Sequence, residues 1–469
     1  MSDKMPTLMG THGMLLMTQF DVEAFVDRTK IGSTQMVALL ICILVCFIDG
    51  FDIFMIGKIA PAIAKDFNQP SEAMGQLFVY QQIGLAIGAF TVSPLADRFG
   101  RRMMLIISCL VFGSITLFSI HARTLHELAL LRGLAGIFMA AGLPMAMAMI
   151  SEITPKHRRA SFVAIALAGY SSGSAASGVV AAWFLDIYGW ESGFWIGGLV
   201  PLICVPLLIL FVPESLKFRA ERDPADPRIA KTLRRLDPSV QLSGDEIFVL
   251  GAGNAKGQKA KLSDVFSEGR MGMTILIWAA CSLSMTNTAL MGAWLPTFFQ
   301  EMAGIPIQEF AKVALVAYLG GIGGTLCVGW LMDRFQATTL LSFFYFMLAA
   351  SLIALSMTPF HSMLFVVVAL IWNFFQTGGQ AGINTMITLV YPPRMRSTAL
   401  GWAGGAGRIG GIIAPIGGAF ALASHYSLQL TMTLAAALPI SVAVLMLCLG
   451  VVIRRDKKIA ADAEAAQAA

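Results

Sequence analysis

Long apolar runs alternate with short polar segments along most of the chain. A helix needs roughly 20 residues to cross the hydrocarbon core of a membrane, which is about 30 Å thick. We therefore predict twelve membrane-spanning helices, at about 36–58, 73–96, 103–121, 125–150, 160–184, 192–212, 272–300, 310–332, 338–358, 362–390, 398–423 and 429–453. The composition agrees, because 57% of the residues are apolar and only 13% are charged, against about 25% charged in soluble domains.

One polar segment is much longer than the others. Residues 213–271 contain 11 Lys and Arg and 9 Asp and Glu, and they separate six apolar runs from six. The pattern divides the chain into an N-terminal segment, a six-helix bundle, a linker, a second six-helix bundle and a tail: 1–35, 36–212, 213–271, 272–453 and 454–469.

Lysine and arginine indicate which side of the membrane each segment occupies. If both termini are cytoplasmic, the inside segments hold 27 of the 33 basic residues, and the outside loops hold only Lys58, Lys65, Arg123 and Lys312. Basic residues are retained on the cytoplasmic side of a membrane. We therefore predict that the N-terminal segment, the linker and the tail are all cytoplasmic.

The two halves share a sequence pattern. PLADRFGRR (94–102) follows the second run and GWLMDRF (329–335) follows the eighth, so Asp97 and Asp333 are 236 positions apart. EITPKHRRAS (152–161) and LVYPPRMRST (389–398) follow the fourth and tenth runs at nearly the same offset. An internal repeat in twelve spans predicts an all-α membrane protein of two pseudo-symmetric six-helix bundles, with a binding site between them near the middle of the membrane.

These motifs resemble those of a known family. SPLADRFGRR (93–102) is similar to the loop signature GxLADRxGRR of the major facilitator superfamily, with Ser93 in place of glycine, and LLRGLAG (130–136) resembles its fourth-helix arginine motif. DGFD (49–52), ahead of GKIAP, resembles the aromatic acid:proton symporters of that superfamily. The resemblance covers essentially the whole chain. It implies the major facilitator fold and transport of an aromatic carboxylate by alternating access.

Two carboxylates interrupt the first apolar run. An ionised side chain at the centre of a membrane helix costs at least about 2.5–3.5 kcal/mol, so such residues are expected to face the bundle interior. Asp49 and Asp52 are three positions apart and lie on nearly the same face of a helix. Both cannot comfortably ionise in a dry pocket, so we predict that one of them exchanges a proton near neutral pH. In the alternative, one pairs permanently with Arg132 and the other lies at the outer interface beside Lys58.

Two arginines lie inside predicted spans. Arg132 is placed to neutralise an ionised Asp49 or Asp52, or to bind a substrate carboxylate through two guanidinium nitrogens. Arg408 has no acid in its own span, and glycines surround it in GGAGRIGGIIAPIGG. A buried arginine without a protein anion suggests an anion from outside. We therefore favour Arg408 over Arg132 as the ligand of the substrate carboxylate.

Polar amides form a stripe along the tenth span. Four of them recur at i, i+3, i+7 and i+11, within about 80° of arc on an α-helix: Asn373, Gln376, Gln380 and Asn384. Amide groups suit ring hydroxyls and carboxylate oxygens, and hydrogen bonding between helices is the alternative use. Further candidates for the same cavity are Asn287 in the seventh span and the aromatic residues Tyr170, Trp372 and Trp402.

The charged residues of the repeated loops are predicted to form a cytoplasmic gate. Asp97 can cap a neighbouring helix and pair with arginines, which would lock the inner side while the outer side is open. The predicted members of the gate are Asp97, Arg98, Arg101, Arg102, Glu152, Arg158, Arg159, Asp333, Arg334 and Arg396.

Together these features predict a symporter of a bacterial inner membrane that imports an aromatic, benzoate-like carboxylate with protons. We expect no cofactor or metal, no nucleic-acid partner and a monomer in the lipid bilayer. One alternative is a carrier for another organic acid, a sugar or a drug, including an exporter. The other is a non-transporting membrane receptor for aromatic acids. An enzyme is not expected, because the sequence shows no nucleophile–base set, metal-ligand cluster or phosphate-binding glycine loop.

Overall fold

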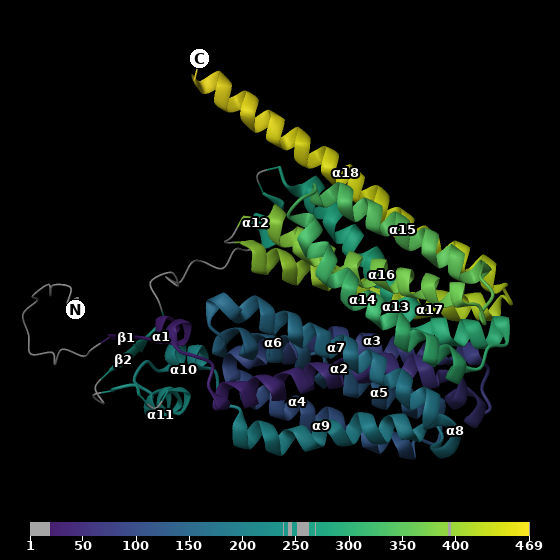
Figure 1. Ribbon diagram of the computed structural model, residues 1–469, viewed down its shortest axis with the longest axis horizontal. Helices are drawn as coiled ribbons and strands as arrows, with labels where there is room; N and C mark the ends of the chain where they lie inside the picture. The colour runs from purple at the N-terminus through teal and green to yellow at the C-terminus, as the bar shows by residue number, and fades with distance from the viewer. Residues whose placement is uncertain are drawn as a thin grey trace, which may run out of the picture.

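The structure is a computed structural model, and it describes residues 19–237, 239–242, 246–250, 262–267, 269–392 and 395–468. Twelve of its helical segments are long and apolar enough to cross a membrane, which confirms the predicted number of spans. They form two bundles, one above the other in Figure 1, with their helices roughly parallel. The predicted all-α fold with two six-helix halves is therefore confirmed.

The first six spans form the N-terminal bundle. Its helices are α2 (Ser33–Asp66), α3 (Met74–Phe99), α4 (Arg101–Phe118), α5 (Leu125–Met139), α6 (Gly142–Ile153), α7 (Lys156–Trp183) and α9 (Glu191–Phe211), joined in part by η1 (Ser71–Ala73), η2 (Ser119–His121) and α8 (Leu185–Tyr188). Gly100 turns the chain between α3 and α4 with a φ of 101°, which glycine adopts without a steric cost. A Cβ at Gly100 would also press against the Glu214 carboxylate. The loop motif therefore needs its glycine.

The last six spans form the C-terminal bundle. Its helices are α13 (Met271–Ala303), α14 (Ile307–Met332), α15 (Ala337–Met357), α16 (Met363–Val390), α17 (Arg396–Ala423) and α18 (Leu428–Ala468). The last helix, yellow in Figure 1, packs along α15 and then continues beyond the bundle to the C-terminus.

Glycines allow the helices that carry the functional residues to pack closely. α2 and α7 approach each other so tightly that a Cβ at Gly50 would collide with the backbone carbonyl of Tyr170. A Cβ at Gly173 would likewise collide with the carbonyl of Phe47. Lipid tails are as apolar as helix surfaces, so the hydrophobic effect does not drive helices together inside a membrane. Close backbone packing of this kind is therefore a main source of stability there.

The two bundles meet along a seam formed by the helix pairs α2 and α13, α3 and α17, and α7 and α14. We call the end of the molecule that carries the linker the linker end, and the opposite end the far end. Several contacts across the seam lie toward the far end. Phe78 packs edge-on against Trp294 at 5.0 Å between ring centroids, and Ser71 donates a hydrogen bond to Glu301 at 2.7 Å.

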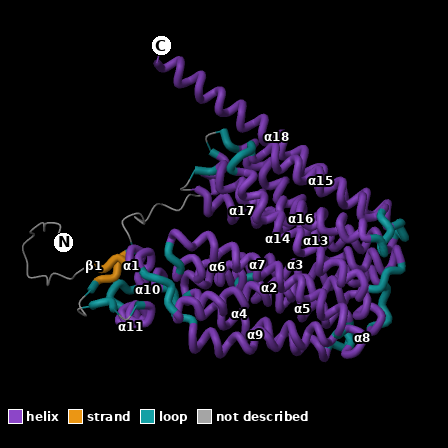
Figure 2. The backbone as a smooth tube through the Cα atoms, in the orientation of Figure 1, coloured by secondary structure: helices purple, strands orange, loops and turns teal. Residues whose placement is uncertain are grey.

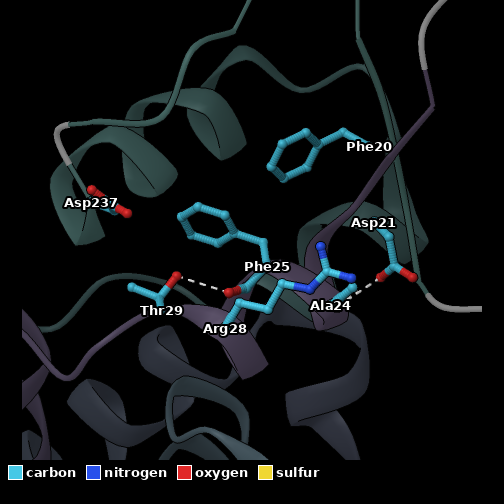
Figure 3. A pocket seen from close by; sticks show the side chains of 7 residues that line it. All are labelled: Phe20, Asp21, Ala24, Phe25, Arg28, Thr29 and Asp237. Carbon is cyan, nitrogen blue, oxygen red and sulfur yellow. Dashed lines mark hydrogen bonds between the residues drawn. The ribbon is translucent and has the colours of Figure 1, made fainter. Parts of the chain in front are cut away.

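A small subdomain caps the linker end of the N-terminal bundle. Two short strands, orange in Figure 2, pair in parallel: β1 (Gln19–Asp21) and β2 (Ile247–Val249). The helices around them are α1 (Val22–Arg28), α10 (Leu216–Arg222) and α11 (Pro227–Leu236), while α12 (Leu262–Phe266) lies next to the C-terminal bundle. The subdomain has its own apolar core, which includes Val26 and Leu233. Figure 3 shows a pocket on this subdomain, where Phe20 and Phe25 lie near Arg28 and Asp237.

The first and fourth spans differ in detail from their predicted ranges. α2 continues to Asp66, so the prediction that Lys58 lies in an outside loop is wrong: the side chain is buried, with 4% of its surface exposed. The lysine looked like a membrane boundary because it ends a long apolar run, but the apolar segment IAPAIA follows it. The fourth span is interrupted, since α5 ends at Met139 and α6 begins at Gly142.

Candidate proton and substrate site

Asp52 forms a buried ion pair with Arg132. Both nitrogens at the end of the guanidinium face the carboxylate: Arg132 Nη1 donates to Asp52 Oδ1 at 3.2 Å and Nη2 donates to Oδ2. Arg132 is 0% exposed and Asp52 is 3% exposed. The guanidinium also lies over the ring of Phe194, at 5.6 Å from its centroid. Because an arginine stays protonated, this geometry places a permanent positive charge against the Asp52 carboxylate.

Asp49 has a different environment, one turn earlier on the same helix. Its carboxylate faces the break between α5 and α6, where a Cβ at Gly142 would lie 3.2 Å from Asp49 Oδ1. The backbone of Leu143, in the first turn of α6, lies close to the carboxylate. The N-terminus of a helix stabilises a nearby negative charge. Within the described residues, no basic side chain forms an ion pair with Asp49.

Asp49 therefore does not lie at the outer interface beside Lys58, as the alternative required. It is 7% exposed, and nine positions of helix rise separate it from Lys58 by about 13 Å. The sequence left open which of the two acids pairs with Arg132. The structure pairs Asp52 with Arg132, and no cation among the described residues forms an ion pair with Asp49.

Arg408 extends from the opposite bundle toward the same region. It lies in the middle of α17 and is partly exposed. Its charge is near enough to interact with Asp49 and with Tyr170. No described residue forms a hydrogen bond or an ion pair with the Arg408 guanidinium. Asp49 and Arg408 thus lie near each other across the seam, and the described residues show no ion pair between them.

Much of the amide stripe on α16 is hydrogen-bonded within the C-terminal bundle. Asn287 donates to Gln376 at 2.6 Å, and Gln376 in turn donates to Thr288 at 2.7 Å. Gln380 accepts from Ser284 at 2.6 Å. These bonds hold α13 against α16, and among the described residues none reaches the buried Oδ1 of Asn287.

The ends of the stripe have other surroundings. Asn373 accepts a hydrogen bond from Thr377 at 3.1 Å on its own helix, and Asn384 is exposed. The structure thus shows the helix-to-helix use for the two central amides, Gln376 and Gln380, and the use of the stripe toward a substrate stays a prediction.

The candidate aromatic residues are not gathered in one wall. Tyr170 lies beside Asp49 and packs edge-on against Phe54 at 6.2 Å. Trp372 is buried in α16, and its Nε1 has no partner among the described residues. Trp402 is 42% exposed and stacks on Trp278 at 6.2 Å. Of the three, Tyr170 is the one that lies with Asp49 and Arg408.

Charged residues of the predicted gate are spread over the linker end. Arg101 forms an ion pair with Glu152, and Arg102 donates to the backbone carbonyl of Leu208 at 3.3 Å. Arg396 donates to the carbonyl of Tyr391 at 3.1 Å. The other members are exposed or partly exposed: Asp97, Arg98, Arg158, Arg159, Asp333 and Arg334. In the described residues no ion pair joins the gate residues of one bundle to those of the other.

Several polar residues near the site were missed from the sequence. Lys58 hydrogen-bonds to α7 and faces Tyr318 of α14, while Ser284 and Thr288 bond to the amide stripe. A serine or threonine inside an apolar run gives almost no sequence signal, because its hydroxyl can bond to its own helix. The described residues contain no group of three or more His, Cys, Asp or Glu side chains arranged to hold a metal ion.

Comparisons with known proteins agree with this architecture. A family model described as the Major Facilitator Superfamily matches residues 42–415. A gallate transporter of Pseudomonas putida is 31% identical over 414 residues, which are 88% of this chain and 91% of the relative. The 4-hydroxybenzoate transporter PcaK of the same species is 30% identical over 414 residues, with 88% and 92% covered. A crystal structure of a D-xylose-proton symporter, at 16% identity, matches with a TM-score of 0.67 over 88% of this chain and 97% of that one.

Proposed function

The chain belongs to the major facilitator superfamily, and from that premise we propose that it imports an aromatic carboxylate together with a proton. The relatives named for gallate and 4-hydroxybenzoate support this substrate class. The observation that carries the mechanism is the unequal pairing of the two acids: Asp52 is held by Arg132, while Asp49 is buried beside a cation that it does not touch.

In the proposed mechanism, Asp49 is the proton carrier. Asp52 is paired with Arg132, whose guanidinium cannot lose its proton, so Asp52 is not the carrier in this mechanism. Ionised Asp49 attracts Arg408 across the seam, and protonation removes that attraction. Arg408 is then free to bind the substrate carboxylate through charge-assisted hydrogen bonds. Proton and substrate therefore bind together. Protonation of Asp49 releases Arg408 for the substrate, and a substrate carboxylate bound to Arg408 favours a neutral, protonated Asp49 next to it.

The substrate ring is proposed to lie between Tyr170 and the amides of α16. Tyr170 offers an aromatic face next to Asp49. The free Oδ1 of Asn287 can accept a hydrogen bond from a ring hydroxyl, and a buried acceptor that is left unpaired costs about 1–3 kcal/mol. This favours hydroxylated aromatic acids over the unsubstituted ring.

The proposed setting is the inner membrane of a bacterium, with one chain as the transporting unit and the proton gradient as its only source of energy. The linker end is cytoplasmic in this proposal, because most lysine and arginine residues lie there. Carrying one proton with a monoanion moves no net charge, so the pH gradient alone would drive it. A second proton would add about 2.3 kcal/mol per 100 mV of membrane potential.

The direct test is uptake of labelled 4-hydroxybenzoate into proteoliposomes, with and without an imposed pH gradient. We expect accumulation only when the far-end side is acidic. Asp49→Asn should abolish this accumulation and keep the exchange of labelled for unlabelled substrate, because the neutral amide imitates the protonated carrier. Asp66→Asn is the matched control, since Asp66 is an exposed residue at the end of the same helix. Uptake that ignores the gradient, or Asp49→Asn proteins that still accumulate substrate, would refute the proposal.

A further inference from the structure

Lys58 is a buried cation that the proposed mechanism does not use. It lies in α2, toward the far end from Asp52, and 4% of its surface is exposed. No described carboxylate pairs with it. Lysine is among the residues that are almost never fully buried without a partner, so its surroundings need an explanation.

Three groups surround the Lys58 ammonium. Two belong to α7, as Nζ donates to the backbone carbonyl of Ser174 at 2.7 Å and to the hydroxyl of Ser177. The third is the ring of Tyr318 on α14, whose centroid is 5.4 Å from Nζ. An ammonium has three N–H donors, and an aromatic face attracts a cation. The ammonium thus has as many partners as it has N–H donors. Two of the partners belong to the N-terminal bundle and one belongs to the C-terminal bundle.

Tyr318 is held in this position by a second contact across the seam. Its hydroxyl accepts a hydrogen bond from Ser174 Oγ at 2.5 Å, and Ser174 is 1% exposed. The contact between the Tyr318 ring and the Lys58 ammonium therefore depends on α7 and α14 being packed together at this position along the seam. When α14 moves away from α7, Ser174 and Ser177 stay with the lysine, but the third side of the ammonium loses its partner.

We propose that Lys58 is the entry site for the carboxylate of the substrate when the far end is open. This inference rests on the proposed function, because it takes the substrate to be a carboxylate. The substrate anion takes the place of the Tyr318 ring, and closure of the far end returns Tyr318 to the ammonium and releases the anion inward. Tyr170 lies on α7 four and seven positions before the two serines, about 6 and 10 Å deeper along the helix. The carboxylate thus passes from Lys58 to the region of Arg408 along one face of α7.

The first test measures labelling of Lys58 in proteoliposomes by a membrane-impermeant amine reagent added on the far-end side, read by peptide mass spectrometry. Benzoate should slow labelling of Lys58 at least fivefold, while benzamide, which has the same ring without the charge, should not. Lys65 and Lys312 are internal controls, because both are exposed near the far end of their helices. Equal protection by benzoate and benzamide would overturn the proposal. So would a Lys58 that stays unlabelled while Lys65 reacts, because a residue that is never reached from this side cannot receive substrate.

The second test uses the direction of transport. Lys58→Gln should raise KM for 4-hydroxybenzoate entering from the far-end side about tenfold, and leave KM for substrate entering from the linker end within twofold. Lys58→Arg should recover most of the far-end affinity. An equal rise of KM on both sides would overturn the proposal and leave Lys58 as a structural residue of the seam. If the wild-type protein transports no aromatic carboxylate, the proposed function fails, but the labelling test still decides whether Lys58 binds a carboxylate.

Discussion

Replacing Asp52 by asparagine should destabilise the protein far more than the same change at Asp49. Arg132 is 0% exposed and directs two nitrogens at Asp52, so Asp52→Asn leaves a buried guanidinium without a counter-charge. Breaking a buried ion pair by removing one partner costs about 3–5 kcal/mol. That corresponds to a decrease of roughly 10² to 10⁴ in the folding equilibrium constant, at about 1.4 kcal/mol per factor of ten.

A double-mutant cycle can show how much of this loss of stability comes from the Asp52–Arg132 ion pair. Arg132→Gln should be destabilising for the matching reason, since it leaves Asp52 as the buried unpaired charge. The double variant, with Asp52→Asn and Arg132→Gln, removes both charges and should be more stable than the sum of the two single losses predicts. Asp49→Asn serves as the control and should change stability by less than about 1 kcal/mol, because Asp49 faces a helix N-terminus and forms no ion pair with a guanidinium among the described residues.

The assay is unfolding by SDS in mixed micelles, followed by circular dichroism and analysed for the free energy of unfolding. Two results would refute the reasoning. A loss of less than about 1 kcal/mol in Asp52→Asn would mean that the ion pair does not hold α2 to α5. Equal losses in Asp49→Asn and Asp52→Asn would mean that the two acids do not differ in their partners.

Two further predictions concern the substrate and the packing. Arg408→Gln should raise KM for 4-hydroxybenzoate roughly tenfold to 100-fold in uptake assays, because a hydrogen bond to a charged group contributes about 1.5–3 kcal/mol; an unchanged KM would exclude Arg408 as the carboxylate ligand. Gly173→Leu should prevent accumulation of folded protein, measured by size-exclusion chromatography, since its side chain would enter the backbone of α2. Gly417→Leu is the matched control and should be tolerated, because nothing lies within 4 Å of its Cβ position.

The architecture could be predicted from the sequence because it depends on patterns that are local in the chain. Each span needs about 20 apolar residues, and the repeated Asp-Arg pairs at Asp97 and Asp333 mark the same place in both halves. The membership of the superfamily, inferred from the same loop, is confirmed by the match over residues 42–415. Predicting these features does not require knowing which helices contact each other in the fold.

The different surroundings of Asp49 and Asp52 could not be predicted in the same way. It depends on Arg132, 80 positions away from Asp52, and on a break in the fourth span that directs a helix end at Asp49. The sequence does contain a signal for that break, because Gly142 and Pro144 stand together in GLPMA. Proline is compatible with the first turn of a helix but not with its interior, so the fourth span could have been divided there.

The linker subdomain was missed because its pattern is short. Val22 and Val26 in α1 are four positions apart, and Ile229, Leu233 and Leu236 in α11 follow the spacing of one helix face. Each set is too small to stand out in a charged segment, and the chain positions that join them are more than 200 residues apart. The two sets share one apolar core in the folded chain, where β1 pairs with β2.

Five acidic and basic side chains inside the described spans suggest why proton and substrate would move together. Asp49, Asp52, Lys58 and Arg132 belong to the N-terminal bundle and Arg408 to the other. With both acids ionised these groups sum to one positive charge, three cations against two anions. Adding a proton on Asp49 and a monoanionic substrate on Arg408 leaves the same sum. In the proposed cycle the empty and the fully loaded protein thus reorient with equal charge, whereas the protein with a proton alone carries one more. Burying that extra charge raises the barrier to reorientation, which opposes leakage of protons without substrate.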